Sequence, residues 1–525
     1  MLRKIHKWTG LILVLIIVIF ALSGIVLNHR ETFSGIDVNR KFMPAEYRYS
    51  NWNNAAVISS LKLSPDSILL YGNAGIWLTD SLFSDFTDFN SGFALGVDNR
   101  KIFDVVLTAD RKLVAATLFG LYNYNFQNKK WNRVQCPVKE VKIVDLIVKR
   151  DSLFVLTRSQ LLVTTDLLHF GVIKVLPAEG DDNKISLFRT LWVIHSGEIY
   201  GLTGKLLVDS VALIFIILSV TGLIYWLKKL KIKSKKQSRE QLVRTRRVMQ
   251  FNLKWHNKLG WITLLFLTLT TITGMFLRPP LLIAIAEARV GKLPYTELAD
   301  TNTWFDKFRK MEYDSESNRY LLATSEGLFS IDADFSTKPI AYTFQPPVSV
   351  MGITVLRKIS AHEWLIGSFE GLYTWNPLTG MVYDYTKKQP YQPQTGRGAP
   401  IGEHLVSGYV NEQGCGEVFF DYNQGAVKMA GEPAFAKMPE KISSTPISLW
   451  NVALEFHTTR IYSFLIGDFY ILIIPLAGLG ILLMLISGFI VWNRHHRAKA
   501  GGYRKPELGI KAERKTKDLL PTEKQ

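Results

Sequence analysis

The stretch IHKWTGLILVLIIVIFALSGIVL, residues 5–27, decides the fold because a second copy of it, WHNKLGWITLLFLTLTTITGMFL, stands at residues 255–277. Each copy is apolar over about the 20 residues that a helix needs to cross a bilayer. The matched positions, all at an offset of 250, are His6 with His256, Gly10 with Gly260, and Ser23-Gly24 with Thr273-Gly274. The repeat therefore predicts an integral membrane protein built from a duplicated unit.

Two further apolar runs, Leu206–Leu227 and Phe469–Trp492, bring the predicted spans to four. Their flanks match as well, as His195-Ser-Gly-Glu-Ile-Tyr200 with His457-Thr-Thr-Arg-Ile-Tyr462, and as Thr221-Gly222 and Trp226 with Ser487-Gly488 and Trp492. The chain thus reads as two copies of span, exterior domain and span. Two spans per copy give both copies the same orientation, so we expect a pseudo-two-fold axis along the membrane normal.

The charges are distributed unevenly along the 525 residues. Lys and Arg number 63 against 45 Asp and Glu, a net charge of +18. Residues 1–7, 228–258 and 494–525 together hold 25 basic and five acidic residues, and the remainder has a net charge of −2. By the positive-inside rule these three segments and both termini are cytoplasmic. The basic pI of the chain is then a signal of topology and does not indicate a nucleic-acid partner.

These features predict a multi-pass membrane protein with both termini in the cytoplasm and the lipid bilayer as its surroundings. The expected segments are the N-terminus and span 1 (1–28), exterior β domain 1 (29–200), span 2 (201–228), a basic cytoplasmic loop (229–257), span 3 (258–278), exterior β domain 2 (279–466), span 4 (467–493) and a basic cytoplasmic tail (494–525).

The exterior domains show short β-rich runs that share a Gly-aliphatic-aromatic signature. It occurs at Gly75-Ile76-Trp77, Gly120-Leu121-Tyr122, Gly327-Leu328-Phe329 and Gly371-Leu372-Tyr373, with spacings of 45 and 44 residues. A period of 40–45 residues is typical of propeller blades. We expect all-β domains and a β-propeller assembled from both halves, with two separate β-meander domains or scattered hairpins as alternatives. Cys136 and Cys415 lie one in each domain, where a disulfide or two unpaired thiols are both open.

The histidines next to the spans are the main candidates for chemistry. A lone histidine at the end of a span can be merely interfacial, but His6 matches His256, and His195 matches His457. A pseudo-two-fold brings the members of each pair to opposite sides of the axis, where two imidazoles could hold one haem iron between them. Glycines on the same helix face would let a flat macrocycle approach the backbone. His29, separated from His6 by about 35 Å of helix, is an alternative ligand.

These motifs resemble the PepSY-associated transmembrane helix family, which includes iron-regulated inner-membrane proteins and siderophore reductases. The resemblance is carried by H-K-W-T-G before a span ending S-G, and by H-x-G-x-I-Y-G before a span ending T-G-x-x-x-W. It implies one or two haem b groups, with His6, His195, His256 and His457 as haem-iron ligands. It also implies an oxidoreductase that passes electrons outward to a ferric chelate or siderophore.

The sequence assigns no catalytic residue and no internal source of electrons. It contains no G-x-G-x-x-G between a strand and a helix and no P-loop, so the electron donor is expected to be a quinol or a separate flavoprotein. A non-enzymatic membrane sensor or adaptor, whose exterior propeller binds a ligand or partner protein, is the alternative, since a fold alone does not determine function. A transporter is a third hypothesis. Asp209 in span 2 is compatible with proton movement and equally with simple snorkelling.

Overall fold

The computed structural model describes residues 1–138, 142–233, 238–349, 352–392, 402–429 and 435–500. Its chain divides into two compact units. Unit 1 comprises residues 1–18, 213–272 and 475–525, and unit 2 comprises residues 19–212 and 273–474. The predicted basic tail is described as far as residue 500, and the rest of it lies outside the described residues.

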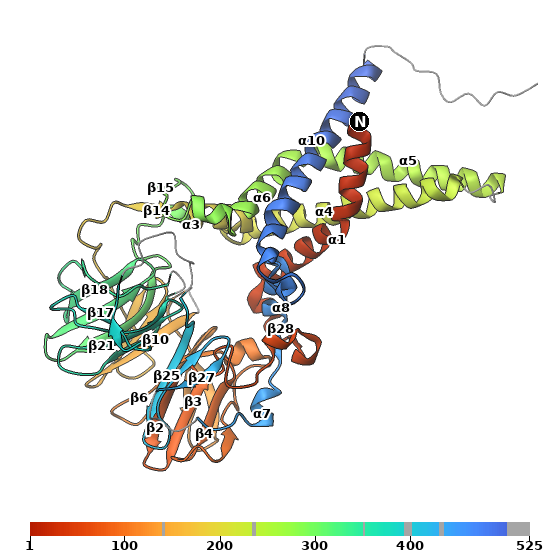
Figure 1. The fold of residues 1–525 in the computed structure, drawn as a ribbon. Helices are drawn as coiled ribbons and strands as arrows, with labels where there is room; N and C mark the ends of the chain where they lie inside the picture. Colours follow the sequence, from red (N-terminus) through yellow and green to blue (C-terminus); the bar gives the residue numbers. More distant parts are fainter. Residues whose placement is uncertain (139–141, 234–237, 350–351, 393–401, 430–434, 501–525) are drawn as a thin grey trace, which may run out of the picture. The chain divides into compact units, whose positions relative to one another are not determined.

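The long helices (Figure 1) are α1 (Leu2–Asn28), α4 (Gly201–Lys233), α5 (Arg239–Ile262), α6 (Leu264–Phe276) and α10 (Ile473–Ala500). Three helical stretches among the described residues are long and apolar enough to cross a membrane, and these are Leu2–Asn28, Glu198–Ile232 and Arg460–Arg497. The chain is therefore a multi-pass membrane protein. The basic segment between α4 and α5 is largely helical, because α4 continues to Lys233 and α5 begins at Arg239.

The expected third span, residues 258–278, is not one straight helix. It is a pair of helices, α5 and α6, bent by 65° where they meet. The break lies at Thr263, whose hydroxyl donates to the Leu259 carbonyl at 2.7 Å while its own N–H bonds the same carbonyl at 3.1 Å. The same back-bond occurs at Thr221 within α4 and at Thr271 within α6, so it marks the bend at Thr263 without explaining its size. The described residues thus hold three candidate spans and one bent pair, which would make four spans if the bent pair crosses as one.

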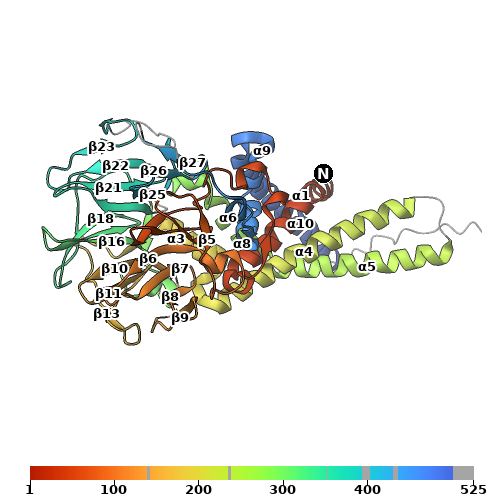
Figure 2. The same cartoon turned by 90° about the horizontal axis from the view of Figure 1, so that it is seen from below.

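Six antiparallel sheets of three to five strands lie in the described part of unit 2 (Figure 2). Those of the first half are β2 (Ser59–Ser64), β3 (Ser67–Gly72), β4 (Gly75–Thr79) and β5 (Phe86–Asp88); β6 (Ile102–Leu107), β7 (Leu113–Thr117), β8 (Gly120–Asn125) and β9 (Lys130–Val134); and β10 (Ile143–Lys149), β11 (Ser152–Thr157), β12 (Leu161–Thr164) and β13 (Gly171–Ile173). Those of the second half are β16 (Phe308–Asp314), β17 (Arg319–Thr324), β18 (Gly327–Asp332) and β19 (Ile340–Ala341); β20 (Ile353–Lys358), β21 (Trp364–Ser368), β22 (Gly371–Trp375), β23 (Val382–Asp384) and β24 (Gln389–Pro390); and β25 (Val406–Glu412), β26 (Gly416–Asp421) and β27 (Gly425–Lys428).

The first strand of each sheet packs against the first strand of the next sheet, in the order β2, β6, β10, β16, β20 and β25, and β25 packs back against β2. Each neighbouring pair of sheets shares a buried apolar cluster. In the cluster between the last sheet and the first, Val418 and Phe420 of β26 pack with Ile68 and Leu70 of β3. The core of unit 2 is therefore distributed between sheets, and the all-β character expected of the exterior segments is confirmed.

The four quoted Gly-aliphatic-aromatic signatures each begin the third strand of a sheet, β4, β8, β18 or β22. The glycine has a positive φ in every case, from +94° at Gly75 to +145° at Gly120. Because residues with a Cβ adopt this conformation only under strain, the tight turn between the second and third strands requires glycine. The 44–45-residue period of the sequence is thus the period of the sheets.

Two small sheets lead into the helices that carry His195 and His457. In them β14 (Lys184–Ser186) pairs with β15 (Arg289–Gly291), and β1 (Asp37–Val38) pairs with β28 (Ile447–Ser448). Helix α3 (Leu187–Ser196) follows β14, and α8 (Leu449–His457) follows β28. The remaining elements are short helices: α2 (Arg30–Phe33), α7 (Glu440–Ser443), α9 (Ser463–Ile466), η1 (Arg40–Phe42), η2 (Ala45–Tyr47), η3 (Val97–Arg100), η4 (Glu198–Tyr200), η5 (Leu281–Ala284), η6 (Glu297–Ala299), η7 (Arg460–Tyr462) and η8 (Gly467–Leu472).

Candidate functional site

The structure brings the four candidate histidines together as two pairs. In unit 1 the rings of His6 on α1 and His256 on α5 have centres 6.0 Å apart, with planes at 83°. In unit 2 the rings of His195 on α3 and His457 on α8 have centres 6.1 Å apart, with planes at 56°. All four side chains are half-buried. We call His6 with His256 the first histidine pair and His195 with His457 the second histidine pair.

The second pair is positioned by two equivalent helix starts. Ser186 caps α3 by accepting the N–H of Arg189 at 3.2 Å, and Ser448 caps α8 by accepting the N–H of Asn451 at the same distance. A serine cap satisfies one of the unpaired donors of the first turn and fixes where the helix begins. Each histidine follows its cap by nine residues, so two matched caps place two matched rings.

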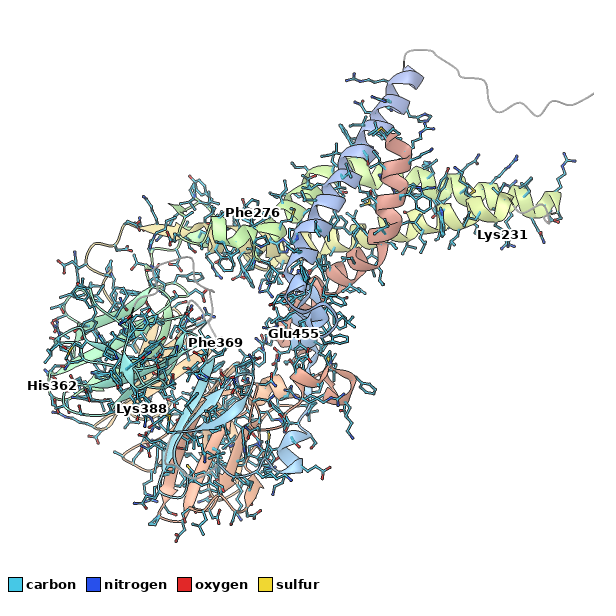
Figure 3. The ribbon with its side chains drawn as sticks, viewed as in Figure 1. Lys231, Phe276, His362, Phe369, Lys388 and Glu455 are labelled. Atoms are coloured by element: carbon cyan, nitrogen blue, oxygen red, sulfur yellow. The ribbon has the colours of Figure 1, made fainter. Side chains whose placement is uncertain are left out.

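Helix α8 is also held by a buried carboxylate. Glu455, labelled in Figure 3, precedes His457 by two residues and accepts the Tyr47 hydroxyl at 2.6 Å. Its other contact is with the Arg460 guanidinium, whose Nε donates at 2.6 Å. A buried charge that is paired and hydrogen-bonded keeps one geometry, because losing either partner leaves it uncompensated. The end of α8 that carries His457 is thereby fixed.

Each ring lies over the glycine of a Ser/Thr-Gly pair on a neighbouring helix. A Cβ built on that glycine would stand 2.8 Å from His6 Cε1 at Gly488, 3.5 Å from His256 Cε1 at Gly222, 2.7 Å from His195 Cε1 at Gly274 and 3.4 Å from His457 Cε1 at Gly24. Whether a macrocycle approaches the backbone at these glycines stays a prediction. They make room for a histidine of another helix.

The pairing of rings with glycines crosses between the two sequence copies. Copy one supplies His6 and His195, which lie on Gly488 and Gly274 of copy two. Copy two supplies His256 and His457, which lie on Gly222 and Gly24 of copy one. Each copy therefore completes the other, as an approximate two-fold relation requires, and neither contains a whole pair.

On each of the four histidines, ring nitrogen Nδ1 has a polar partner. His6 Nδ1 lies 2.9 Å from the Met484 carbonyl, His256 Nδ1 lies 3.1 Å from the Leu218 carbonyl, and His457 Nδ1 lies 3.1 Å from the Phe20 carbonyl. A carbonyl only accepts, so these three Nδ1 atoms carry the proton and Nε2 carries the lone pair. His195 Nδ1 lies 3.2 Å from Thr273 Oγ1.

Hydroxyls of the Ser/Thr-Gly pairs also contact the histidine rings. Ser23 Oγ lies 2.9 Å from His457 Nδ1, and Thr221 Oγ1 lies 3.1 Å from His256 Nδ1. Both hydroxyls also donate to a carbonyl of their own helix, at 2.6 Å in each case. Such outer contacts are what orients a metal-ligating histidine and selects its tautomer.

The ring separations suit a metal ion between the members of each pair. Metal–imidazole bonds of about 2.0 Å, with roughly 1.2 Å from nitrogen to ring centre, place two opposed ligand rings about 6.4 Å apart. The observed 6.0 and 6.1 Å are close to this value. Within the described residues no group of three or more His, Cys, Asp or Glu side chains gathers for a metal. Each pair thus presents two imidazoles and no third His, Cys, Asp or Glu side chain among the described residues.

His29 lies elsewhere. Its Nε2 is 2.5 Å from Asp209 Oδ2, and Asn28 donates to Asp209 Oδ1 at 3.1 Å and to the Ser196 carbonyl at 3.1 Å. The structure thus gives the acid of α4 two polar partners, one of them the histidine that the sequence offered as an alternative ligand. Within the described residues, Cys136 and Cys415 are not joined by a disulfide.

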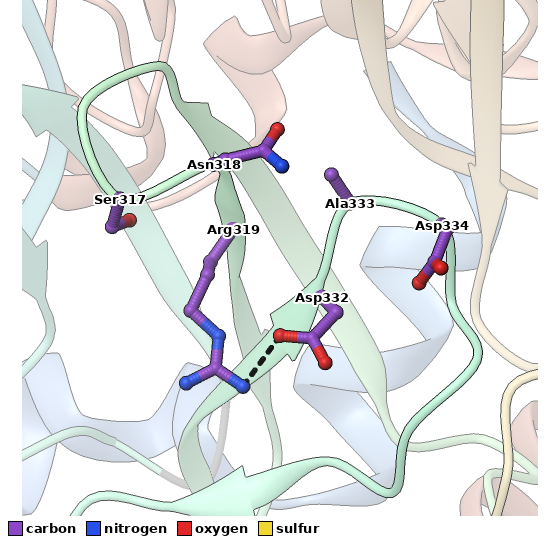
Figure 4. Close-up of a pocket in the computed structure, with 6 residues that line it drawn as sticks. All are labelled: Ser317, Asn318, Arg319, Asp332, Ala333 and Asp334. Carbon is purple, nitrogen blue, oxygen red and sulfur yellow. Dashed lines mark ion pairs between the residues drawn. The ribbon is translucent and has the colours of Figure 1, made fainter.

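A surface hollow of about 600 Å³ lies where the turn between β16 and β17 meets the end of β18 (Figure 4). An ion pair between Arg319 and Asp332, 2.6 Å apart, crosses it. Its lining residues are Ser317, Asn318, Arg319, Asp332, Ala333 and Asp334. Apart from Ala333 these side chains are polar, and none of the four histidines lines the hollow.

Sequence reasoning identified the four histidines but not what holds them. The capping serines were missed, although the repeat Ile185-Ser186-Leu187 and Ile447-Ser448-Leu449 stands nine residues before each histidine in both copies. The Ser/Thr-Gly pairs were used as landmarks of the repeat, and their contact with the histidines of other helices could not be seen in one sequence.

The sequence model of the PepSY-associated TM region matches residues 3–326, more than half of the chain. The chain belongs to this family. The matched residues of this PepSY-associated TM protein include His6, His195 and His256. No curated protein matches the chain.

Solved structures resemble the chain only distantly. The extracellular domain of a protein described as a hybrid two component system of B. thetaiotaomicron aligns with 75% of this chain and 35% of its own, at 11% identity and a TM-score of 0.35. PorZ, a surface component of the type-IX secretion system of Porphyromonas gingivalis, aligns with 70% and 37%, at 10% identity and a TM-score of 0.29. The chain spans little more than a third of the length of these structures.

Proposed function

We propose that each histidine pair holds one haem b, and that the protein transfers electrons across the membrane to an acceptor outside. The observation that carries this proposal is the duplicated geometry: two pairs of rings, 6.0 and 6.1 Å apart, each ring fixed through Nδ1. Haem is the metal group that needs only two protein ligands, because its macrocycle supplies the other four nitrogens.

When bound, haem supplies one-electron redox chemistry at the iron. The protein's part is to keep His6, His256 and His457 in the tautomer whose Nε2 can ligate, and to keep the paired rings at a fixed separation. A rigid ligand pair suits electron transfer, because the site then needs little rearrangement when the charge of the iron changes. The protein therefore acts through positioning, and the redox potential is set by its ligands and their outer contacts.

The electrons come from a quinol or a separate flavoprotein, and the acceptor is a ferric chelate or siderophore. The donor loses one electron for each ferric ion reduced, and the chelated iron gains it in passing from Fe(III) to Fe(II). The localisation that goes with this direction is the bacterial inner membrane with both termini cytoplasmic. The support for it is the concentration of basic residues in three segments.

The test is a dithionite-reduced minus oxidised spectrum of the purified protein, with iron measured per chain. Wild-type protein should show b-type bands and two haems. His6→Ala with His256→Ala should lose one haem, and His195→Ala with His457→Ala should lose the other. The matched control is His169→Ala with His362→Ala, which removes two exposed histidines from the connections between strands and should keep both haems. Absent bands, or an unchanged iron content in both double variants, would contradict the proposal.

We also infer that the six sheets are the blades of one propeller built from both halves of the chain. The support is the cyclic packing of their first strands, in which β25 returns to β2. A further support is that the apolar cluster between the last sheet and the first mixes residues of the two halves, such as Phe420 with Leu70. Crosslinking a cysteine pair placed across that junction would test the closure.

A non-enzymatic sensor or adaptor is the second candidate. The observation that favours it is that the four paired histidines lie on α1, α3, α5 and α8, while the six sheets lie apart from them in sequence. So large a β domain is not needed to hold two metal sites. A ligand or partner protein that binds the exterior with wild-type affinity in all four histidine variants would favour this function over electron transfer.

A further inference from the structure

Three consecutive sheets present a basic residue where their first strand begins. Lys101 immediately precedes β6, Lys142 immediately precedes β10, and Arg309 is the second residue of β16. The Lys142 ammonium lies 4.9 Å from the centre of the Phe103 ring of β6, so the starts of these two strands lie side by side. Because β10 also packs against β16, all three cations gather at one end of the strands. These residues form the basic mouth.

The carboxylates nearest in sequence are used at a deeper level. Asp104 and Asp145 each follow a mouth lysine by three residues. Asp104 accepts the Leu146 N–H at 3.1 Å, and Asp145 accepts the Met311 N–H at 2.8 Å and the Lys310 ammonium at 2.9 Å. Each aspartate therefore joins its own strand to the first strand of the next sheet. That role holds it away from the lysine at the mouth.

Two further acids near the mouth are held by arginines. Asp98 is bound by Arg30 through two bonds of 2.8 and 2.9 Å, and Asp306 lies 2.6 Å from Arg158 Nε. Among the residues that the structure describes, no carboxylate lies within ion-pair distance of the Lys101 or Lys142 ammonium. Among the described residues, basic side chains therefore outnumber unpaired acids at the mouth, although the segments outside the three basic stretches are almost neutral in sum.

The protein around these lysines disfavours their charged form. Burial, followed by the neighbouring Arg30, lowers the pKa of Lys101 to about 8. Burial and the nearby cations Arg158 and Lys101 hold the pKa of Lys142 well below its usual value. A bound anion would offset both effects, because an opposite charge close to an amine favours its protonated form.

We propose that the basic mouth binds a small polyanion, a molecule that carries several carboxylate or phosphate groups. Lys101 and Lys142 supply ammonium groups that no carboxylate of the described residues pairs, and Arg309 borders the same opening. Two lysines act as compact point charges with rotatable donors, which suits an anion recognised by charge more than by shape. The inference goes beyond the proposed function, because it requires neither the paired histidines nor electron transfer.

The experiment is calorimetric titration of the full-length protein in nanodiscs of uncharged lipid at low ionic strength. Citrate represents the carboxylates and inorganic pyrophosphate represents the phosphates, and both probes are redox-inert. The test variant is Lys101→Gln with Lys142→Gln. The charge-matched control is Lys130→Gln with Lys174→Gln, which removes two exposed lysines at the outer edges of the same two sheets. Lys101→Arg with Lys142→Arg preserves the charge.

We expect saturable binding that falls at least tenfold in the test variant, stays within twofold in the control and is kept by the arginine variant. Binding should also weaken as salt rises, since the contact is electrostatic. The probe that binds more tightly identifies the source of the anionic groups. If neither probe binds saturably, or if the test variant and the control lose the same affinity, the proposal is wrong. The haem spectrum of the test variant should be unchanged, so failure here and failure of the haem proposal are separable.

Discussion

The contacts between the histidine rings and the glycines beneath them predict that two glycine-to-alanine substitutions, which look equivalent in sequence, have unequal effects on the histidines. Gly488 and Gly222 occupy matched positions of the repeat and lie under His6 and His256 of the first pair. An alanine Cβ at Gly488 would stand 2.8 Å from His6 Cε1 and 3.0 Å from Nδ1, whereas at Gly222 it would stand 3.5 Å from His256 Cε1. The distance at Gly222 is an ordinary van der Waals contact, whereas the distances at Gly488 are too short for one.

Gly488→Ala therefore has to move the His6 ring by about 0.6 Å to restore contact distance. That shift also strains the 2.9 Å bond from Nδ1 to the Met484 carbonyl. Overpacking of this kind costs about 1–3 kcal/mol, or roughly a 5- to 150-fold loss of affinity for a group held by that ring. Both substitutions gain similar helix propensity, about 1 kcal/mol for glycine to alanine, so that contribution cancels in the comparison.

The assay is haem content per chain and the affinity of haem for the apoprotein, measured in both variants and in wild type. Gly488→Ala should lose affinity at one of the two sites, and Gly222→Ala should behave like wild type. Gly274 and Gly24 of the second pair repeat the comparison, with Cβ distances of 2.7 and 3.4 Å. Equal effects of Gly488→Ala and Gly222→Ala would refute the reasoning, because the two differ chiefly in the space above the glycine.

Three further outcomes follow from the contacts of unit 2. His29→Ala should leave haem content unchanged while lowering the unfolding free energy by about 1.5–3 kcal/mol, the usual worth of a hydrogen bond to a charged group, since His29 contacts Asp209; loss of a haem would show that it is a ligand. Burial, followed by the Asp145 carboxylate, raises the pKa of Glu312 to about 7, so the folded state holds a proton that the unfolded state releases above about 4.5. Stability should therefore fall by up to about 3 kcal/mol as pH rises from 4.5 to 7, and thermal unfolding of Glu312→Gln over that range should show a smaller fall. Asp104→Ala should cost about 1–3 kcal/mol by leaving a buried N–H unpaired, and Asp104→Asn, which keeps an acceptor, should cost less in a denaturant titration.

The pattern of apolar runs and glycines predicted much of the architecture. Long apolar segments and the 44–45-residue signature predicted a multi-pass protein with all-β exterior segments because both depend on local chemistry. The bend of the third span at Thr263 was not predicted, because hydropathy reports how apolar a segment is and not whether its helix is straight.

The histidines could be predicted as pairs, but their partners could not. Repeat arithmetic matches His6 with His256, and the contact between their rings follows from an approximate two-fold axis. The glycine under each ring belongs to the other copy and to a different helix, which is a tertiary relation that no spacing encodes. His29 shows the same limit, because only the folded chain places it beside Asp209.

A short repeated motif explains why the sequence did not predict the mouth lysines. The first half contains the motif twice, as Lys101-Ile-Phe-Asp104 and Lys142-Ile-Val-Asp145. In a sum over the sequence, the charge of each lysine is offset by the aspartate three positions later. In the fold the two members of each motif do different work: the aspartate bonds the next sheet, and the lysine remains at the opening. Net charge per segment is what a topology prediction by the positive-inside rule uses, because there only the sum matters. It is a poor guide to binding, which depends on whether each charge has a partner within a few ångströms.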